Sequence, residues 1–345
     1  MRVLFIKLTS MGDLIHALPA LTDAQRAHPS MSFDWVIEKS FSEVALWHPA
    51  VNRIIPTSHR HWRKNFRASL KNGEIKDFIR AIRAEKYDLV IDGQTSIKSA
   101  VTSLLSKGLR CGLDRHSARE SLASFAYQKK ISVPKEMHAI ERLRLLFSQV
   151  LNYPYEQTAP DYHIDQYDFP ALTFALPKPY IVLVHNASWS SKLWPEAYWR
   201  KLTILAAESG VHVVLPWGNS EEKLRALRIA HNQSNATVLP FCRLSEHATI
   251  LKNALGAICS DTGLSHLAAA LNVPSVTLYG STSTKLIGTQ GLYQNHLRSN
   301  FACKECYKTL CRYNDTRHQE PLCLTALKPE TVWEGFRHMV RSARS

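Results

Sequence analysis

The chain has 345 residues and a formal net charge of +14 at pH 7, with 43 Lys and Arg residues against 29 Asp and Glu residues. This length exceeds what one compact core usually holds, so we expect two domains. The positive charge suits an anionic partner, such as nucleic acid, an anionic lipid surface or a phosphorylated substrate, but it fits a basic solvated surface equally well. No apolar run approaches the roughly 18 residues of a membrane-spanning helix. The start, MRVLFIKL, lacks the apolar stretch and cleavage site of a signal peptide, so we expect a cytoplasmic protein.

The first half alternates short apolar runs with helical patterns, which predicts a doubly wound parallel sheet. The expected strands are Arg2–Leu8, Phe33–Glu38, Arg53–Pro56 and Tyr87–Asp92. The expected helices are Asp13–Ala27, Phe41–Trp47, Glu74–Glu85 and Ser96–Ser106.

Residues 154–179 carry five prolines and no periodicity, so we interpret them as a linker between a domain of residues 1–153 and one of residues 180–327. The alternation resumes after the linker. The expected strands are Tyr180–His185, His212–Pro216, Ala236–Leu239, Gly256–Ser260 and Ser275–Tyr279. The expected helices are Pro195–Ser209, Ser220–His231, Ser245–Asn253, Gly263–Leu271 and a final one within residues 328–345. Two such halves place a ligand crevice at the strand carboxyl ends of each, and facing halves would merge the crevices into one cleft.

The loop after the first strand, Ser10-Met11-Gly12-Asp13, leads into a helix but is not a dinucleotide-binding glycine fingerprint. Gly12 permits a tight strand-to-helix turn. Asp13 at the helix start is compatible with two roles. It could cap the helix, as Asp often does, or serve as a general base at the mouth of the cleft.

In the second half, a strand ends in Ser260-Asp261-Thr262-Gly263-Leu264-Ser265-His266, where a helix begins. Amide groups at a helix start favour a phosphate or diphosphate, although Asp261 or Thr262 could simply cap the helix and His266 could be structural. The loop from His185 to Pro195 offers Ser188 and Lys192 for phosphate contacts, although Lys192 could equally be a solvated loop lysine. After the next strand, Glu222 could accept ribose hydroxyls or compensate the helix dipole.

Between Val51 and Gly73 there are six cationic residues and no acidic ones, with aromatic residues interleaved. Arginine binds carboxylates and phosphates through paired hydrogen bonds, so the segment suits an anionic acceptor. Interleaved aromatic rings also suit single-stranded nucleic acid.

Four of the seven cysteines lie within 21 residues in a C-x2-C-x4-C-x11-C pattern. Cys303, Cys306, Cys311 and Cys323 could form a zinc site or remain thiols, and we assign them no catalytic role. There is no D-x-D triplet, so the carboxylate pair typical of a divalent metal with a diphosphate is missing from the sequence.

Together these segments resemble the ADP-heptose:lipopolysaccharide heptosyltransferases, most closely the heptosyltransferase I subfamily. The matching stretches run in order over most of the chain: MRVLFIKLTSMGDLIHALPALTDAQ, FDWVIE, HRHWRK, YDLVID, SARESLAS, SKLWPEAYWR, LPWG and SDTGLSHLAAAL. The resemblance implies the GT-B fold, with two facing Rossmann-like domains and a C-terminal helix that crosses back to the first domain. It also implies inverting transfer without a metal or other cofactor.

The resemblance further implies a role for each matching residue. Asp13 matches the catalytic base, and Ser10 and Gly12 match the loop on the acceptor side. Residues that grip the acidic Kdo sugars and phosphates are matched by Arg60, Arg63 and Lys64. Donor contacts are matched by His185, Ser188, Lys192, Glu222, Asp261, Thr262, Gly263 and His266. The implied partners are ADP-heptose, Kdo-lipid A and, peripherally, the cytoplasmic face of the inner membrane, with no nucleic acid.

Two departures from the family leave the acceptor open. Ala187 and Ser188 stand where members often carry two threonines, and some members lack the cysteine cluster. The acceptor could therefore be one phosphorylated Kdo or a Kdo disaccharide, and addition of a later core heptose is an alternative. A basic nucleic-acid-binding protein is an alternative of another class, although no recognised nucleic-acid module occurs.

Overall fold

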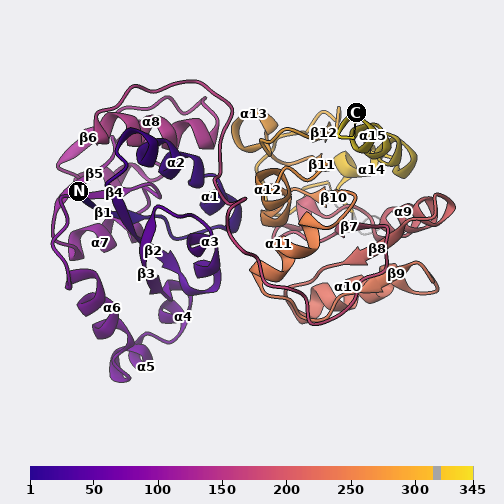
Figure 1. The fold of residues 1–345 in the computed structure, drawn as a ribbon, viewed down its shortest axis with the longest axis horizontal. Coiled ribbons are helices and arrows are strands. Elements are labelled where there is room, and N and C mark those ends of the chain that lie inside the picture. Colours follow the sequence, from indigo (N-terminus) through magenta and orange to yellow (C-terminus); the bar gives the residue numbers. More distant parts are fainter. Residues whose placement is uncertain (314–319, 345) are drawn as a thin grey trace. The chain divides into compact units, whose positions relative to one another are not determined.

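The structure, a computed structural model, describes residues 1–313 and 320–344. The chain forms two compact units, Met1–Tyr167 and Asp168–Ser345, each built on a six-stranded parallel sheet (Figure 1). The boundary in sequence lies within residues 154–179, where no helix or strand forms.

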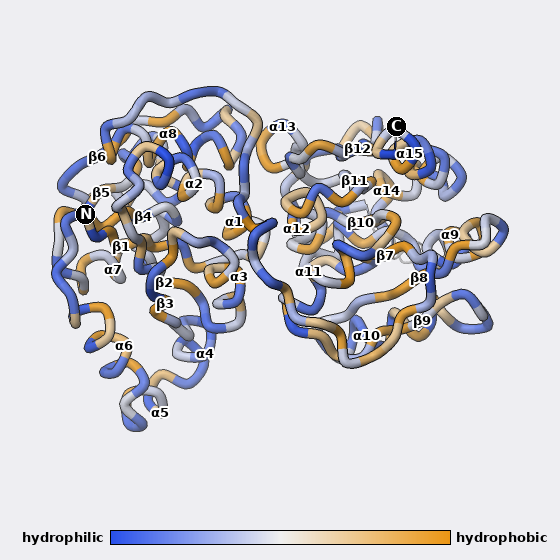
Figure 2. The backbone as a smooth tube through the Cα atoms, in the orientation of Figure 1, coloured by the Kyte–Doolittle hydropathy of each residue, from blue (hydrophilic) through white to orange (hydrophobic). Residues whose placement is uncertain are grey.

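The sheet of the first unit has the strand order β3-β2-β1-β4-β5-β6, which is the doubly wound order. Central β1 is buried along most of its length because helices cover both faces of a parallel sheet, and Figure 2 shows hydrophobic residues along β1 and β2. The strands are β1 (Arg2–Ile6), β2 (Ser32–Glu38), β3 (Val51–Thr57), β4 (Leu89–Asp92), β5 (Leu109–Leu113) and β6 (Lys129–Ile131).

Eight α-helices accompany this sheet in the first unit. They are α1 (Met11–Ile15), α2 (Leu18–Ala27), α3 (Ser42–Leu46), α4 (His59–Lys64), α5 (Phe66–Lys71), α6 (Glu74–Arg83), α7 (Ile97–Leu105) and α8 (Ala139–Leu151). Two short 3₁₀ helices, η1 (Lys39–Phe41) and η2 (Ser121–Ala126), complete the unit.

The single helix predicted over Asp13–Ala27 is wrong, because α1 and α2 are separate. Pro19 lies in the first turn of α2. Proline has no N–H and its ring would clash with the carbonyl four residues before it, so it begins a helix more readily than it continues one. The break leaves α1 as a five-residue helix directly after β1.

The sheet of the second unit has the order β12-β11-β10-β7-β8-β9. The strands are β7 (Tyr180–Val184), β8 (His212–Leu215), β9 (Ala236–Val238), β10 (Ala257–Ser260), β11 (Ser275–Tyr279) and β12 (Gln294–Arg298). The helices are η3 (Ser190–Lys192), α9 (Glu196–Glu208), α10 (Ser220–Ala230), α11 (Leu244–Lys252), α12 (Gly263–Ala270), α13 (Thr284–Ile287), α14 (Leu322–Thr325) and α15 (Pro329–Ser342). The expectation of two Rossmann-like halves is confirmed.

The core of the second unit centres on two tryptophans. Trp194 and Trp199 meet edge to face with ring centroids 5.0 Å apart, and the Trp194 indole donates to the carbonyls of Leu324 and Leu327. Helix α15 adds Trp333 to the same core and contacts α9, β11 and β12. Contact of this helix with the first unit stays a prediction.

Within residues 1–313 and 320–344, no helix combines the length and the apolar character needed to cross a bilayer.

Gly112 supports a buried contact in the first unit and gives a test of the fold. A Cβ at Gly112 would lie 2.5 Å from the ring of Tyr127, whose hydroxyl donates to Asp92 Oδ2 at 2.7 Å. We expect Gly112→Ala to displace the ring and lower the free energy of unfolding by about 1–3 kcal/mol in urea denaturation. Gly335→Ala, inside α15, is the control: its Cβ would lie 3.1 Å from the side-chain nitrogen of Asn295, which can shift, and alanine is about 1 kcal/mol better than glycine in a helix, so stability should not fall. Equal stability of the two variants would contradict this account.

Candidate functional site

Each unit gathers sequence-predicted residues at the carboxyl ends of its central strands. In the second unit, β7 and β10 are neighbouring parallel strands, so the loops that follow them start at the same edge of the sheet. Lys192 lies in the loop after β7 and Asp261 directly follows β10. Their side chains form an ion pair, with Lys192 Nζ 2.6 Å from Asp261 Oδ2.

The ion pair is largely shielded from solvent. The side chains of Lys192 and Asp261 are 14% and 3% exposed, and the lysine ammonium also lies 4.7 Å from the ring centroid of Trp189. His266 Nε2 is 4.0 Å from Asp261 Oδ1. The structure therefore brings three of the predicted donor residues together: Lys192, Asp261 and His266.

Helix α12 begins beside this pair. Thr262 is its N-cap residue and Gly263 its first residue. The first amide groups of a helix have no partner inside it and carry the positive end of the helix dipole. Next to the ammonium of Lys192, they give the second unit a place suited to a diphosphate.

The other predicted donor residues lie at the same sheet edge in different surroundings. Glu222 accepts a hydrogen bond from the Gly218 amide at 2.7 Å, so it stabilises the start of α10. Ser188 is exposed. His185 is completely buried, and this burial, with the nearby Arg225, lowers its pKa to about 3, so the imidazole is neutral at physiological pH.

Sequence reasoning missed the loop after β11. Thr282 donates a hydrogen bond from Oγ1 to Asp261 Oδ2, and the hydroxyl oxygens of Ser281 and Ser191 lie 3.2 Å apart. Since β11 pairs with β10, its following loop has to lie next to Asp261, and this neighbour relation was the available signal.

The cysteine segment packs against the Lys192 loop. Ser191 Oγ donates to the carbonyl of Lys308 at 2.5 Å, and the Ser191 amide donates to the carbonyl of Thr309 at 3.2 Å. All four predicted cysteines are free thiols that line one small cavity: Cys303, Cys306, Cys311 and Cys323. Burial raises the pKa of Cys323 to about 11. Among the described residues, no group of His, Cys, Asp and Glu side chains is arranged to hold a metal ion.

In the first unit, Asp13 lies on α1 directly after β1. Ser10 is the N-cap residue of this helix and Asp13 its third residue, whose side chain accepts from the Ser10 amide in a capping box. The alternative prediction that Asp13 caps the helix is therefore wrong in position, but Asp13 does stabilise the helix start. Both the amide and the hydroxyl of Ser10 donate to Asp13 Oδ2 at 2.8 Å. The carboxylate of Asp13 is half-buried and its other oxygen, Oδ1, is not used in these two bonds.

The charge of Asp13 depends on residues that sequence reasoning missed. Burial favours the neutral acid, but Lys7, the two hydrogen bonds from Ser10 and Arg119 outweigh burial and lower the pKa of Asp13 below 3.8. Lys7 is itself buried, with Nζ donating to the carbonyl of Gly93 at 3.0 Å. A lysine inside an otherwise apolar strand run was the signal for this role.

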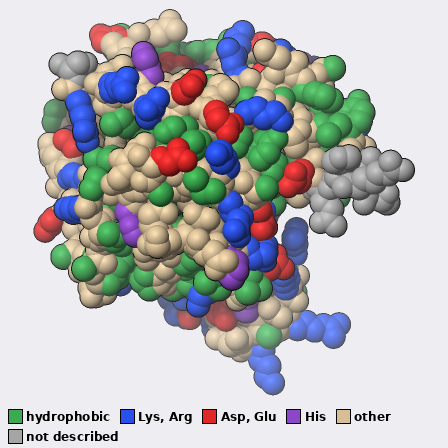
Figure 3. Space-filling view, turned by 90° about the vertical axis from the view of Figure 1, so that its right-hand side faces the viewer, with side chains coloured by type: hydrophobic (Ala, Val, Ile, Leu, Met, Phe, Trp, Pro, Cys, Tyr) green, Lys and Arg blue, Asp and Glu red, His purple; other side chains and the backbone are tan. Residues whose placement is uncertain are grey.

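The predicted acceptor residues lie on α4. Arg60, Arg63 and Lys64 are all exposed, and the Arg60 guanidinium lies over the ring of Phe41, 6.0 Å from its centroid. Lys and Arg side chains project from the lobe at the lower edge of Figure 3, where Figure 1 places α5. Gly12 is buried within α1, and Ser10 is exposed at its start.

The Lys192–Asp261 pair can be tested by stability alone. Removal of one partner leaves the other charge shielded and unpaired, so we expect Asp261→Asn to lower the free energy of unfolding by about 3 kcal/mol. The double variant Lys192→Met/Asp261→Asn should recover part of the loss. Asp77→Asn is the control, since its pair with Arg80 is more than 60% exposed on both sides and should contribute under about 1 kcal/mol. Strictly additive losses at Lys192 and Asp261 would contradict the coupling.

Comparison with known proteins agrees with this arrangement. The profile of glycosyltransferase family 9 (heptosyltransferase) matches residues 75–316. Lipopolysaccharide heptosyltransferase 1 of Pseudomonas aeruginosa is 46% identical over 343 residues, which cover 96% of each chain. The similarity therefore extends well beyond the segments that carry the predicted site residues.

Solved structures are similar over nearly the whole chain. The Escherichia coli heptosyltransferase WaaC with ADP superposes with a TM-score of 0.85 at 40% identity, over 98% of this chain and 100% of that one. The same enzyme with ADP-2-deoxy-2-fluoro heptose gives a TM-score of 0.82 at 39% identity, over 98% and 99%. The GT-B fold class and the predicted family are thus confirmed, and the chain is a glycosyltransferase that belongs to family 9, the heptosyltransferases.

Proposed function

We propose that this protein transfers L-glycero-D-manno-heptose from ADP-heptose to a Kdo residue of Kdo-lipid A, with inversion and without a metal ion. The observation that carries the proposal is the 46% identity, over 96% of both chains, to a lipopolysaccharide heptosyltransferase 1. The ADP and ADP-fluoroheptose bound in the solved relative support ADP-heptose as the donor.

The second unit supplies groups suited to the donor. Lys192 and the first amides of α12 would hold the diphosphate, and Glu222 would accept the ribose hydroxyls. Ser188, Thr262, Gly263 and His266 would complete the contacts to phosphate and heptose. As the bond between the anomeric carbon and the diphosphate oxygen breaks, its electron pair stays on ADP, and fixed positive groups stabilise that charge.

The first unit supplies the base. Asp13 would take the proton from the acceptor hydroxyl while the oxygen attacks the anomeric carbon on the face opposite to the leaving ADP, so the configuration inverts. A positioned base of this kind typically contributes about 10²–10⁴-fold to the rate. Ser10 would hold the carboxylate in place through the two hydrogen bonds described above.

The cationic residues of α4 suit the acidic acceptor. Arg60, Arg63 and Lys64 would bind Kdo carboxylates and lipid phosphates, which are anions that guanidinium groups bind well. A lipid acceptor and the +14 net charge together favour a peripheral position on the anionic cytoplasmic face of the inner membrane.

Turnover on one phosphorylated Kdo, a Kdo disaccharide and a heptosylated core, each with chelator present, would identify the acceptor and test metal independence.

Asp13→Asn tests the proposed base. The amide keeps the size of the side chain but cannot accept the proton, so we expect kcat on ADP-heptose and Kdo-lipid A to fall by at least about 100-fold. The Kd for ADP, measured by calorimetry, should stay within about twofold, because the donor groups lie in the other unit. Asp77→Asn, an exposed carboxylate on α6, should match the unaltered protein. Near-normal turnover of Asp13→Asn would remove Asp13 from the mechanism.

The pH dependence tests the contribution of Lys7. Asp13 acts as a carboxylate and its folded pKa is lowered below 3.8, so it stays ionised from pH 5 to 8 and causes no acid loss of kcat/KM in that range. In Lys7→Met the largest of the charges that lower this pKa is gone, while burial, which raises it, remains. We expect the acid limb of kcat/KM to move to higher pH. Lys107→Met, at the opposite end of the sheet before β5, should leave the profile unchanged, and an unmoved limb in Lys7→Met would contradict this role.

A further inference from the structure

We propose that a cavity beside the cationic helix α4 binds an acyl chain of the lipid acceptor. The proposal rests on the proposed function, since it assigns a second part of the same acceptor to the first unit. The cavity has a volume of about 520 Å³, which lies within the roughly 300–1,000 Å³ of small-molecule pockets. Its apolar wall comes from α4, α5, α6 and α7: Trp62, Phe66, Phe78, Ile79, Val101 and Leu105.

The polar groups in the wall are already paired with protein atoms. The Trp62 indole N–H donates to Glu74 Oε2 at 3.0 Å. His59 Nε2 and Thr102 Oγ1 lie 3.4 Å apart, and the same hydroxyl donates to the carbonyl of Lys98 at 2.9 Å. Burial, reinforced by the charge of Lys98, lowers the pKa of His59 to about 4. The interior therefore offers a neutral surface that favours hydrocarbon over a polar ligand.

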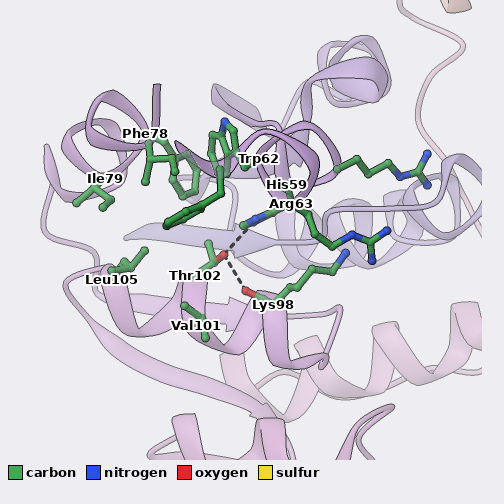
Figure 4. Close-up of a pocket in the computed structure, with 12 residues that line it drawn as sticks. His59, Trp62, Arg63, Phe78, Ile79, Lys98, Val101, Thr102 and Leu105 are labelled. Atoms are coloured by element: carbon green, nitrogen blue, oxygen red, sulfur yellow. Dashed lines mark hydrogen bonds between the residues drawn. The ribbon is translucent and has the colours of Figure 1, made fainter. Parts of the chain in front are cut away.

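The charged lining residues are all cationic. Arg60, Arg63 and Lys98 line the cavity, and no Asp or Glu does. In Figure 4 the charged ends of Arg63 and Lys98 extend towards the same side, away from Ile79 and Leu105. A hydrocarbon region with positive charge at one side is complementary to an amphiphile that has an alkyl chain and an anionic head.

An exposed apolar face of α7 extends from the cavity. Val101, which lines the cavity, is 51% exposed, and Ile97 and Leu104, outside the lining, are 47% and 52% exposed; their spacing of four and three residues places all three on one face of the helix. Phe66 on α5 is 59% exposed. Exposed apolar side chains clustered at a cationic site indicate contact with an apolar partner.

The lipid acceptor is a better candidate for the cavity than an unrelated membrane lipid, because one short helix carries both the proposed acceptor-binding arginines and part of the apolar wall. Helix α4 has six residues and is roughly 9 Å long. It bears Arg60 and Arg63, which are the residues proposed to hold the acceptor's anionic groups, and Trp62, which forms part of the apolar wall. An acceptor whose sugars and phosphates are held there has its acyl chains next to the opening.

Val101→Asn tests the cavity through substrate preference. Val101 lines the cavity and is half exposed, so a neutral amide there should leave the fold intact and the anionic head unaffected but make the wall less favourable to an acyl chain. We expect KM for Kdo-lipid A to rise about tenfold, with KM and kcat unchanged for the fully deacylated acceptor. Leu122→Asn, an exposed side chain of η2 that does not line the cavity, is the matched control and should leave both KM values unchanged. An equal effect of Val101→Asn on both acceptors, or none on either, would overturn the proposal.

A binding measurement keeps this test separate from the proposed function. Dodecyl phosphate with bromine near the end of its chain should quench the fluorescence of Trp62, and Trp62→Phe should lose that part of the quenching. Lipid A should compete with the probe more strongly than phosphatidylglycerol vesicles do. Absence of quenching, or stronger competition by the vesicles, overturns the acyl site even if heptose transfer is observed. Absence of transfer overturns the proposed function, whereas the quenching still decides the cavity.

Discussion

A lysine paired electrostatically with a carboxylate at the carboxyl end of a central parallel strand is the constraint on which both candidate sites depend. In the first unit the buried Lys7 follows β1 and acts on Asp13. In the second unit Lys192, in the loop after β7, contacts Asp261. Both lysines lie where the strand order reverses, between β1 and β4 and between β7 and β10. Doubly wound sheets leave a crevice for ligands at this point, because successive helices cross to opposite faces.

The two pairs use the same attraction for opposite purposes. Lys7 donates to a backbone carbonyl inside the unit and, with Ser10 and Arg119, lowers the pKa of Asp13, so the carboxylate is the group available for chemistry. Asp261 is almost fully buried. It accepts a hydrogen bond from Thr282 and forms an ion pair with Lys192, so in the second unit the ammonium of Lys192 is the group held in place. A base is thus prepared in one unit and an anion-binding cation in the other. The pairing also has a cost, since Lys192 has to share its charge with Asp261 when a diphosphate binds.

The parts of the fold and site that could be predicted are those marked by a clear pattern in the local sequence. Continuous apolar runs identified β1, β2, β4, β7, β10 and β11, and the strand-to-helix turns placed Asp13 and Asp261 at sheet edges. Strand β12, with the sequence QNHLR, was missed because it lies at the edge of the sheet and is only partly buried. Contacts between distant loops, such as Thr282 with Asp261, depend on strand order, which local pattern does not determine.

The basic segment shows how structure separates two interpretations of one sequence pattern. Base stacking on single-stranded nucleic acid requires exposed rings along a groove. Trp62 is instead 9% exposed and packs against Phe78 with ring centroids 5.3 Å apart, and both rings face the cavity in Figure 4. The cationic residues of α4 point to solvent while its tryptophan supports the apolar wall. The interleaved pattern is therefore that of an amphipathic helix, which suits a ligand with an anionic head and a hydrocarbon chain rather than a chain of stacked bases.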